Sequence, residues 1–411
     1  MTSRRTVMKG LAGLAVATAL ENTVADSSGV APPPAEPGLA SGTAGSAEWV
    51  TLPGKAPLIK RTFRPPNLET PLSYFREPVT PNKAFFVRYH HANIPKVDPA
   101  TWSLRVGGVA AGQPLTFNLA QLRSQFEMVE VTALCLCSGN RRGLFSPHVM
   151  GVQWGSGAMG NARWRGVRLA DVLKKAGVRP DALEVAFDAS DSALMPDGPD
   201  FQKSLPAAKA LDGNTLIALE MNGEPLPHLH GAPARLVVPG WTATYWLKHL
   251  TSIDVRTSPF ENFWVKTAYR IPTGAYPGLE RFASQETPVN TPITEIAVNS
   301  LITAPAPHEQ LAKGGAIEVR GVAWDAGHGL ERVEVSLDRG RKWSAARLGE
   351  DLGRYSLRPW SFRVSAPETA ATVSVWVKAS SRNGTTQPPE PVPNPAGYHH
   401  NRIQTLDLAV A

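Results

Sequence analysis

One short segment of this sequence places a cysteine beside two arginines. Cys137 is followed by Ser138-Gly139-Asn140 and then by Arg141 and Arg142. Soft transition metals prefer a thiolate donor, and guanidinium groups bind oxyanions. The segment therefore predicts a metal centre that handles a small anionic substrate. The only other cysteine is Cys135, too close for an unstrained disulfide, so two inert buried thiols are the alternative.

Two further clusters place cations beside imidazoles. Arg88 and His90 end an apolar run that begins at Phe85, and they lie two residues apart, on one face of an expected strand. His230 is followed by Arg235, with Lys248 beyond. Convergent Arg, His and Lys side chains suit a polyanionic cofactor such as a phosphate-bearing pterin.

Residues 155–160 match the dinucleotide-binding pattern G-x-G-x-x-G. Such a loop should open directly into a helix, but residues 161–166 follow here before any helix is expected. The context therefore disfavours a nicotinamide-dependent dehydrogenase. The sequence also lacks G-x-S-x-G, H-E-x-x-H, C-x-x-C and C-x-x-C-H patterns, which weighs against hydrolase, zinc and covalent haem sites.

The elements that must position these residues are strands with a few short helices. Strands are expected over Ala84–Tyr89, Val129–Cys137, Leu183–Phe187 and Ala234–Val238, and a helix over Leu169–Ala176 that ends at Gly177. Together they predict an α+β catalytic domain over residues 50–285.

The composition changes after Pro288. Short alternating strands are expected at 317–324, 332–337 and 372–377, with turn signals such as Asn383-Gly384 between them. Residues 290–411 are therefore predicted to form a β-sandwich of immunoglobulin type.

Residues 1–32 are predicted to be a twin-arginine export signal and leader. Arg4 and Arg5 precede an apolar run over residues 11–20, which is too short to span a bilayer. An ordinary secretory signal is the alternative, and both predict a periplasmic protein. The net charge of +7 is spread along the chain, so neither nucleic acid binding nor a membrane span is expected.

The motifs, taken in order, resemble those of the sulfite oxidase family of molybdopterin enzymes. The resemblance covers residues 50–405. It rests on Phe-Phe-Val-Arg-x-His, Cys-x-Gly-Asn-Arg-Arg, Met221–Pro227, His230-Gly-x-Pro-x-Arg235 and Ser336-x-Asp338-x-Gly340-x-x-Trp343. It implies a mixed molybdopterin domain followed by an immunoglobulin-like dimerisation domain.

The resemblance also implies roles for single residues. Cys137 would ligate molybdenum beside the pterin dithiolene. Arg88 and Arg142 would hold the sulfite oxyanion, Trp154 would wall the pocket, and Tyr269 would hydrogen-bond near the metal's oxo group. The residues that would bind the cofactor are Phe86, Val87, Arg88, His90, Cys137, Asp191, His230, Arg235 and Lys248.

One position departs from the family pattern. Vertebrate members carry an additional pocket arginine just before a glycine in the C-terminal domain, where this sequence has Ala396 before Gly397. The pocket would then carry less positive charge unless another residue supplies it. His399 and His400 are the nearby candidates.

The resemblance implies oxidation of sulfite to sulfate at a molybdenum–molybdopterin centre. The export signal and the lack of a haem domain resemble bacterial periplasmic sulfite dehydrogenases, which pass electrons singly to a c-type cytochrome. A homodimer and a tight complex with a haem c subunit both remain open. The alternatives are a same-family reductase acting on nitrate or a sulfoxide and, from another class, an exported binding protein.

Overall fold

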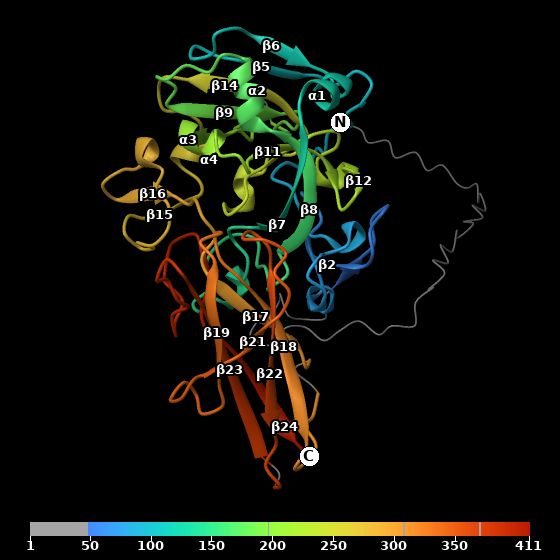
Figure 1. Cartoon of the computed structure of the whole chain (residues 1–411), viewed down its shortest axis with the longest axis vertical. Coiled ribbons are helices and arrows are strands. Elements are labelled where there is room, and N and C mark those ends of the chain that lie inside the picture. The colour runs from blue at the N-terminus through green and yellow to red at the C-terminus, as the bar shows by residue number, and fades with distance from the viewer. Residues whose placement is uncertain (1–47, 196, 307–308, 370) are drawn as a thin grey trace, which may run out of the picture. The chain divides into compact units, whose positions relative to one another are not determined.

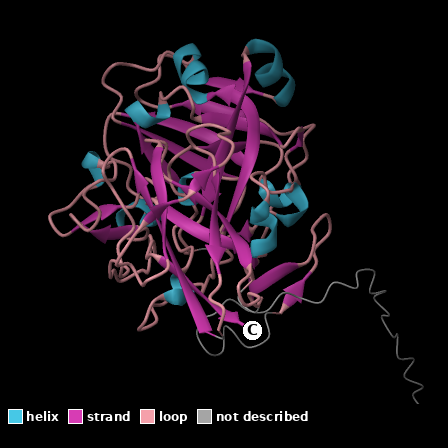
Figure 2. Cartoon of the chain, turned by 60° about the horizontal axis from the view of Figure 1, so that its bottom comes forward, coloured by secondary structure: helices cyan, strands magenta, loops and turns pink. Residues whose placement is uncertain are grey.

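Strands make up most of the ordered structure, and the helices are few and short (Figures 1 and 2). The computed structural model describes residues 48–195, 197–306, 309–369 and 371–411. Its α-helices are α1 (Leu119–Gln125), α2 (Leu169–Lys175), α3 (Ala207–Ala210) and α4 (Phe263–Lys266). Its 3-10 turns are η1 (Leu72–Arg76), η2 (Asn82–Ala84), η3 (Arg142–Leu144), η4 (His228–His230), η5 (Ala243–Tyr245) and η6 (Ala283–Gln285).

Three sheets and a hairpin organise the catalytic region. The first sheet runs β1 (Trp49–Val50), β2 (Leu58–Thr62), β3 (Asn67–Glu69), β4 (Val87–Arg88). The second runs β10 (Lys203–Pro206), β9 (Glu184–Ala189), β14 (Leu250–Arg256), β5 (Leu104–Gly107), β6 (Leu115–Phe117). The third runs β12 (Glu224–Pro225), β11 (Leu216–Met221), β8 (Met159–Arg168), β7 (Met128–Leu136), and β13 (Arg235–Val237) also pairs with β11. The hairpin joins β15 (Arg270–Pro272) to β16 (Asn290–Pro292).

The β7–β8 ladder positions the segment over residues 137–142, which holds Cys137 and the two arginines. It pairs Cys135 with Gly160 and Leu136 with Met159, so Cys137 leaves the sheet at the end of β7. Gly160 is required here because a Cβ atom would lie 2.4 Å from the ring of Phe85. Cys137 is therefore fixed by strand register rather than by a free loop.

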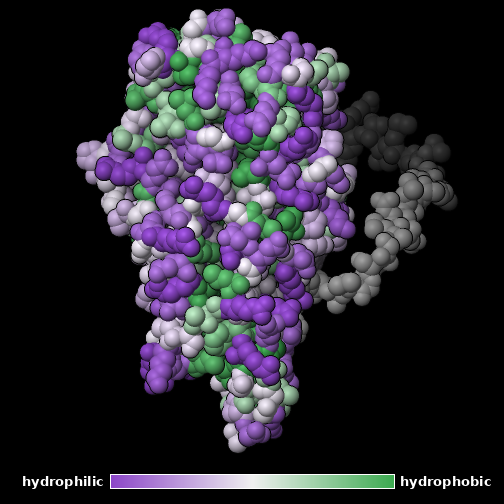
Figure 3. Space-filling model, viewed as in Figure 1, coloured by the Kyte–Doolittle hydropathy of each residue, from purple (hydrophilic) through white to green (hydrophobic). Residues whose placement is uncertain are grey.

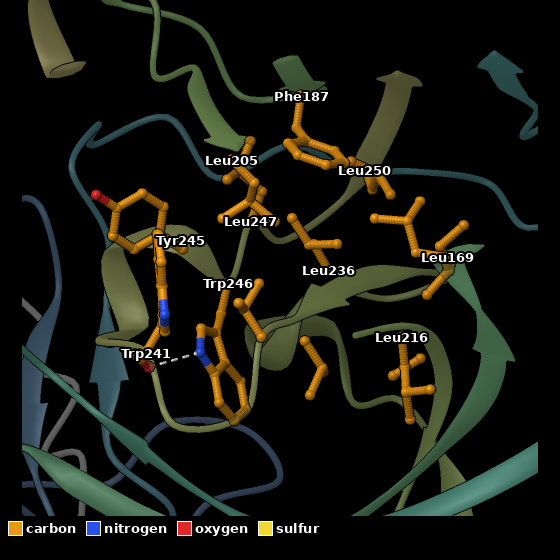
Figure 4. Close-up of a cluster of buried hydrophobic side chains, with 14 of the residues drawn as sticks. Leu169, Phe187, Leu205, Leu216, Leu236, Trp241, Tyr245, Trp246, Leu247 and Leu250 are labelled. Carbon is orange, nitrogen blue, oxygen red and sulfur yellow. Dashed lines mark hydrogen bonds between the residues drawn. The ribbon is translucent and has the colours of Figure 1, made fainter. Parts of the chain in front are cut away.

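The main hydrophobic core is formed by side chains of these sheets and of the segments between their strands. Figure 4 shows Phe187, Leu205, Leu236 and Leu250, which come from β9, β10, β13 and β14, packed together with aromatic side chains of the segment around η5. The Trp246 indole donates a hydrogen bond of 3.0 Å to the carbonyl of Trp241, so this buried polar atom is satisfied.

The C-terminal region holds two four-stranded antiparallel sheets. One runs β17 (Asn299–Ala304), β18 (Ala316–Trp324), β22 (Arg358–Ser365), β21 (Arg347–Leu348). The other runs β20 (Ser344–Ala345), β19 (Leu330–Ser336), β23 (Ala371–Ser381), β24 (Gln404–Val410). A separate apolar cluster joins Leu301 and Trp324 from this region to Leu134 and Met159, which flank the Cys137 segment.

Most of the predicted elements are present. The predicted helix is α2, and Gly177 follows it with a φ of +70°. The strand predicted over Ala84–Tyr89 was too long: it is limited to Val87–Arg88, because Asn82–Ala84 forms a 3-10 turn after Pro81.

The predicted fold class is confirmed only in part, and the predicted domain limits stay a prediction. The chain is mostly sheet, so helices contribute less than the α+β prediction implied, and the immunoglobulin type of the C-terminal sheets stays a prediction. β16 pairs back with β15, so the predicted boundary between 285 and 290 falls inside a hairpin. The predicted export signal at 1–32 lies outside the described residues.

Hydrophilic side chains cover most of the face shown in Figure 3, and hydrophobic ones are interspersed among them. Within the described part of the chain, no helix is both long and apolar enough to cross a membrane.

Candidate active site

A cavity opens where the ends of β4, β7 and β13 meet the loops before β14 and β15. Its wall includes both cysteines and most of the predicted cationic and imidazole side chains. The lining residues that carry polar chemistry are Arg88, Tyr89, His90, Cys135, Cys137, Ser138, Asp191, His230, Arg235, Thr244, Lys248 and Tyr269. Segments separated by more than 180 residues of sequence thus converge on the Cys137 thiol.

A tight turn holds Cys137. Its amide donates to the carbonyl of Ala158 at 2.9 Å, and its carbonyl accepts from the amide of Asn140 at 2.9 Å. Arg141 adopts a left-handed φ of +66°, which reverses the chain immediately after the thiol. Both cysteines are buried and free, so each sulfur remains available as a thiol.

One side of the cavity carries buried cations whose hydrogen bonds go to neutral acceptors. The Arg235 guanidinium donates to the carbonyls of His230 at 3.1 Å and Trp246 at 3.0 Å, while its Nε atom has no partner. Lys248 donates to the carbonyl of Arg88 at 2.6 Å and lies 3.0 Å from the ring centroid of Tyr89. Burial lowers the pKa of Lys248 well below its usual range, with Arg235 adding repulsion.

The other side joins an arginine to an imidazole–phenol pair. Arg88 donates to Asn67 Oδ1 at 3.1 Å and to the carbonyl of Tyr89. The His90 Nε2 atom shares a short hydrogen bond with the Tyr269 hydroxyl. Burial lowers the pKa of His90 and raises that of Tyr269, so both groups are neutral near pH 7. Tyr269 itself has a φ of +60°, which aims its ring into the cavity.

Asp191 is the one carboxylate among the described residues that line the cavity. Burial raises its pKa to about 6, while the Lys248 charge opposes that shift. Its neighbour Asp188 instead accepts from the amide of Ala189 at 2.8 Å and does not line the cavity. The structure thus brings Asp191 rather than Asp188 to the site.

Three predicted residues are not brought to the cavity wall. The Arg142 side chain donates to the carbonyls of Ala396 at 2.8 Å and Val152 at 3.1 Å. Trp154 is fully buried in the main core, and the Val87 side chain packs in a separate apolar cluster with Leu58. Phe86, by contrast, does line the cavity.

His399 and His400 lie on the far side of Cys137. They line a second, very small cavity of about 10 Å³ that shares Cys137 and Ser138 with the main one. This volume is close to the space that one water molecule needs, so it is too small for sulfite. Both His399 ring nitrogens and the His400 Nδ1 atom lack partners, which fits a bound water. Neither histidine supplies the charge missing at Ala396 to the main cavity.

The glycine-rich segment binds a side chain of the protein itself. The amides of Gly155 and Gly157 donate to the Glu69 carboxylate at 3.0 and 2.8 Å, and that carboxylate also pairs with Arg61. Gly160 continues directly into β8. The segment is therefore not the opening of a dinucleotide-binding helix, as its context had indicated.

The donor set fits a metal that brings its own ligands together with a polyanion. Within the described ranges, no group of three His, Cys, Asp or Glu side chains is placed to hold a metal ion. Cys137 and Cys135 are the soft donors at the wall, too few to hold a metal by themselves, so the cofactor must supply the other ligands. Three Arg or Lys side chains face one carboxylate, and the unpartnered Nε of Arg235 points to a missing acceptor, which a pterin phosphate would provide.

A strand-rich fold with thiols at the wall of a cation-lined cavity fits a molybdopterin-binding oxidoreductase. The sequence matches the oxidoreductase molybdopterin binding domain over residues 91–264 and the Mo-co oxidoreductase dimerisation domain over residues 290–406. The chain belongs to the sulfite oxidase family, and its cofactor is molybdenum–molybdopterin.

Individual relatives support this membership. The mitochondrial sulfite oxidase of Macaca fascicularis is 34% identical over 374 residues, which is 87% of this chain and 67% of the macaque protein. A nitrate reductase [NADH] of Oryza sativa subsp. japonica is 29% identical over 374 residues, covering 86% of this chain and 40% of the rice protein. The crystal structure of the sulfane dehydrogenase SoxCD from Paracoccus pantotrophus has the same fold, with a TM-score of 0.71, 24% identity and 88% coverage of each chain.

Three residues near the site were not predicted from the sequence. Lys55 is buried, donates to the carbonyls of Asn82 at 2.8 Å and Phe85 at 2.9 Å, and contacts the His230 ring. Tyr398 stacks on Tyr269 with ring centroids 5.6 Å apart, and Lys203 lies beneath the same tyrosine. None of the three stands in a motif, so only their burial identifies them.

Proposed function

We propose that this protein oxidises sulfite to sulfate and passes the electrons singly to a c-type cytochrome. The observation that carries the proposal is the Cys137 thiol at the wall of a cavity whose Arg and Lys side chains outnumber its carboxylates. The family membership and the sulfite oxidase relatives support the choice of substrate.

The residues divide the work between cofactor and substrate. Cys137 would ligate the metal, while Arg235, Lys248 and His230 would hold the pterin and its phosphate. When bound, the molybdenum centre supplies oxygen-atom transfer and takes up the two electrons. Arg88 lines the cavity and would bind the sulfite oxyanion, so its value lies in orienting the substrate.

The Tyr269 hydroxyl and His90 would hold a proton close to the substrate. Because burial keeps both groups neutral near pH 7, each can donate a hydrogen bond without adding charge. Arg142 would act on Tyr269 indirectly. Its guanidinium lies 5.3 Å from the ring centroid of Tyr398, and Tyr398 stacks on Tyr269. We assign Arg142 to positioning this aromatic pair.

The proposal extends to location and assembly. The predicted export signal supports action in the periplasm, and the match to a dimerisation domain supports a homodimer. Fractionation of cells that express the full chain tests the first, and sedimentation of the purified protein tests the second.

The direct test combines molybdenum and pterin analysis with an assay. Purified, molybdenum-loaded protein should reduce cytochrome c when sulfite is added and should not reduce nitrate when given an electron donor. Nitrate reduction without sulfite oxidation would instead favour the activity named for the rice relative. Protein purified without molybdenum and without either activity would favour an exported binding protein.

A further inference from the structure

Lys203 is a fully buried cation that the proposed function does not use. It is the first residue of β10, and its side chain has no exposed surface. The Nζ atom donates to the carbonyl of Trp264 at 2.5 Å. It also lies 4.7 Å from the ring centroid of Tyr245 and 5.1 Å from that of Tyr269. One carbonyl and two aromatic faces thus surround the ammonium group.

This environment leaves the charge of Lys203 without a counter-ion on the protein. Burying an ammonium group is expensive unless an anion pairs with it, and cation–π contacts offset only part of the loss. Burial lowers the pKa of Lys203 to about 7, with repulsion from Arg270 as the second cause. Among the described residues, no ion pair includes Lys203, and no carboxylate contributes to its pKa shift.

Lys209 shows how the same fold satisfies a similar lysine. It lies on α3, directly after β10, and also contacts a carbonyl, that of Pro239 at 3.3 Å, and an aromatic ring, that of Trp241 at 5.7 Å. Unlike Lys203, it pairs with a carboxylate of its own, Asp212, at 3.6 Å. Lys203 therefore differs from Lys209 in lacking an anion.

Tyr269 links Lys203 to the cavity, because its ring lies 5.1 Å from the Lys203 Nζ atom and also lines the cavity. The Tyr269 hydroxyl contacts His90 there. The positive charge of Lys203 also helps to lower the pKa of the His90 imidazole. Because His90 lines the cavity, the electrostatic influence of Lys203 extends into it. Since Arg142 donates to main-chain carbonyls and does not line the cavity, Lys203 beneath Tyr269 is a further positive charge close to the cavity wall.

We propose that the anion bound in the cavity is the counter-ion of Lys203, which makes Lys203 a positioning residue that selects anionic substrates through the ring of Tyr269. The identity of the anion rests on the proposed function. Since Lys203 does not touch the reacting atoms, its charge should govern how tightly the anion binds rather than how fast it reacts.

The test compares Lys203→Met with the control Lys209→Met in molybdenum-loaded protein. In sulfite oxidation, Lys203→Met should raise KM about tenfold or more while kcat stays within about threefold of wild type. Lys209→Met should change neither constant. Lys203→Arg, which keeps the charge, should recover a KM close to that of wild type, whereas Lys203→Gln should resemble Lys203→Met. This set separates the role of charge from that of packing.

A second measurement needs no turnover. Titration with inorganic sulfate should raise the unfolding temperature of wild type and of Lys209→Met, and should raise it much less for Lys203→Met and Lys203→Gln. An unchanged KM together with an unchanged sulfate response in Lys203→Gln would overturn the inference, as would Lys203→Arg behaving like Lys203→Met. If wild type does not oxidise sulfite, the proposed function fails, but the sulfate titration still decides whether Lys203 pairs with a bound anion.

Discussion

The cavity and the C-terminal sheets treat positive charge in opposite ways. Across the C-terminal sheets, cations pair with carboxylates on the surface: Arg320 with Glu318 at 2.5 Å, and Arg332 with Glu334 at 3.1 Å. In the cavity, Arg235 and Lys248 donate instead to main-chain carbonyls. Exposed ion pairs are screened by water and contribute little to stability. Buried cations without a carboxylate partner bind an anionic ligand favourably, because the ligand supplies the counter-charge that the protein lacks. The difference separates charge used for solubility from charge used for binding.

The largest expected effect comes from removing the proposed metal ligand, Cys137. Cys137→Ser should abolish sulfite oxidation while much of the pterin stays bound, because the cations that hold it are untouched. Changes to residues around metal ligands lower activity about 10- to 100-fold, and loss of the ligand itself should exceed that. Steady-state kinetics measure the sulfite oxidation activity, and pterin fluorescence measures how much pterin stays bound. An active, molybdenum-loaded Cys137→Ser protein would contradict the assignment.

Removing a cavity cation should affect the cofactor rather than the chemistry. Arg235→Met should lower pterin content to below about a tenth of wild type, because a charge-assisted bond to phosphate is lost in a buried site. The measurement is pterin and molybdenum per protein after purification. If Arg235→Met protein keeps its full cofactor content, the buried cations of the cavity do not bind the cofactor, and the proposed difference from the surface charges of the C-terminal sheets is wrong.

The buried lysines should also give the cofactor-free protein a particular pH dependence. Burial lowers the pKa of both Lys55 and Lys203 from 10.5 to about 7. Between these values the unfolded chain binds more protons than the folded one, so the free energy of unfolding should rise as pH increases from 7 toward 10. Chemical denaturation at pH 7 and pH 9 measures the change in the free energy of unfolding. This change should be smaller in the double variant Lys55→Met, Lys203→Met than in wild type. A steeper rise in the double variant than in wild type would refute the account.

The smallest effect is expected on the C-terminal sheets. Arg332→Met removes an exposed cation that pairs with Glu331 and Glu334, where water screens the interaction. Neither cofactor content nor KM for sulfite should change, and the unfolding temperature should stay within the scatter of wild-type preparations. Loss of cofactor in this variant would mean that surface pairs also support the cavity.

Sequence patterns predicted the parts of the site that a strand register fixes. Cys137 directly follows a strand whose two ends were each expected within one residue, and both cysteines line one cavity, as their spacing of two residues indicates. Asp191, His230 and Lys248 also line that cavity. The cysteines could be predicted because alternation along a strand reports on which face a side chain lies. His230 and Lys248 were predicted from a cluster of cations and imidazoles, and Asp191 was implied only by the family resemblance.

Side-chain direction after an irregular turn could not be predicted in this way. Arg142 follows Arg141, which has a left-handed backbone, and the Arg142 side chain donates to the carbonyl of Ala396 and does not line the cavity. Gly139 permits this path, since a Cβ atom there would lie 2.6 Å from the Arg142 guanidinium. Sequence spacing carries no information about such a reversal.

Isolated lysines were also beyond prediction. Lys55 and Lys203 stand alone in unremarkable segments, and a lysine outside a motif is ordinarily assigned to the surface. Their burial depends on contacts with His230, Trp264 and Tyr245, which are between 42 and 175 residues away in sequence. Only the three-dimensional structure brings these groups together.

The central claim is that Cys137 joins the metal to the protein at the wall of this cavity. X-ray absorption at the molybdenum edge, recorded on wild type and on Cys137→Ser, tests it most directly because it counts the sulfur atoms bound to the metal. The account predicts one sulfur ligand more in wild type than in the variant. Equal sulfur counts in two molybdenum-loaded proteins would contradict it.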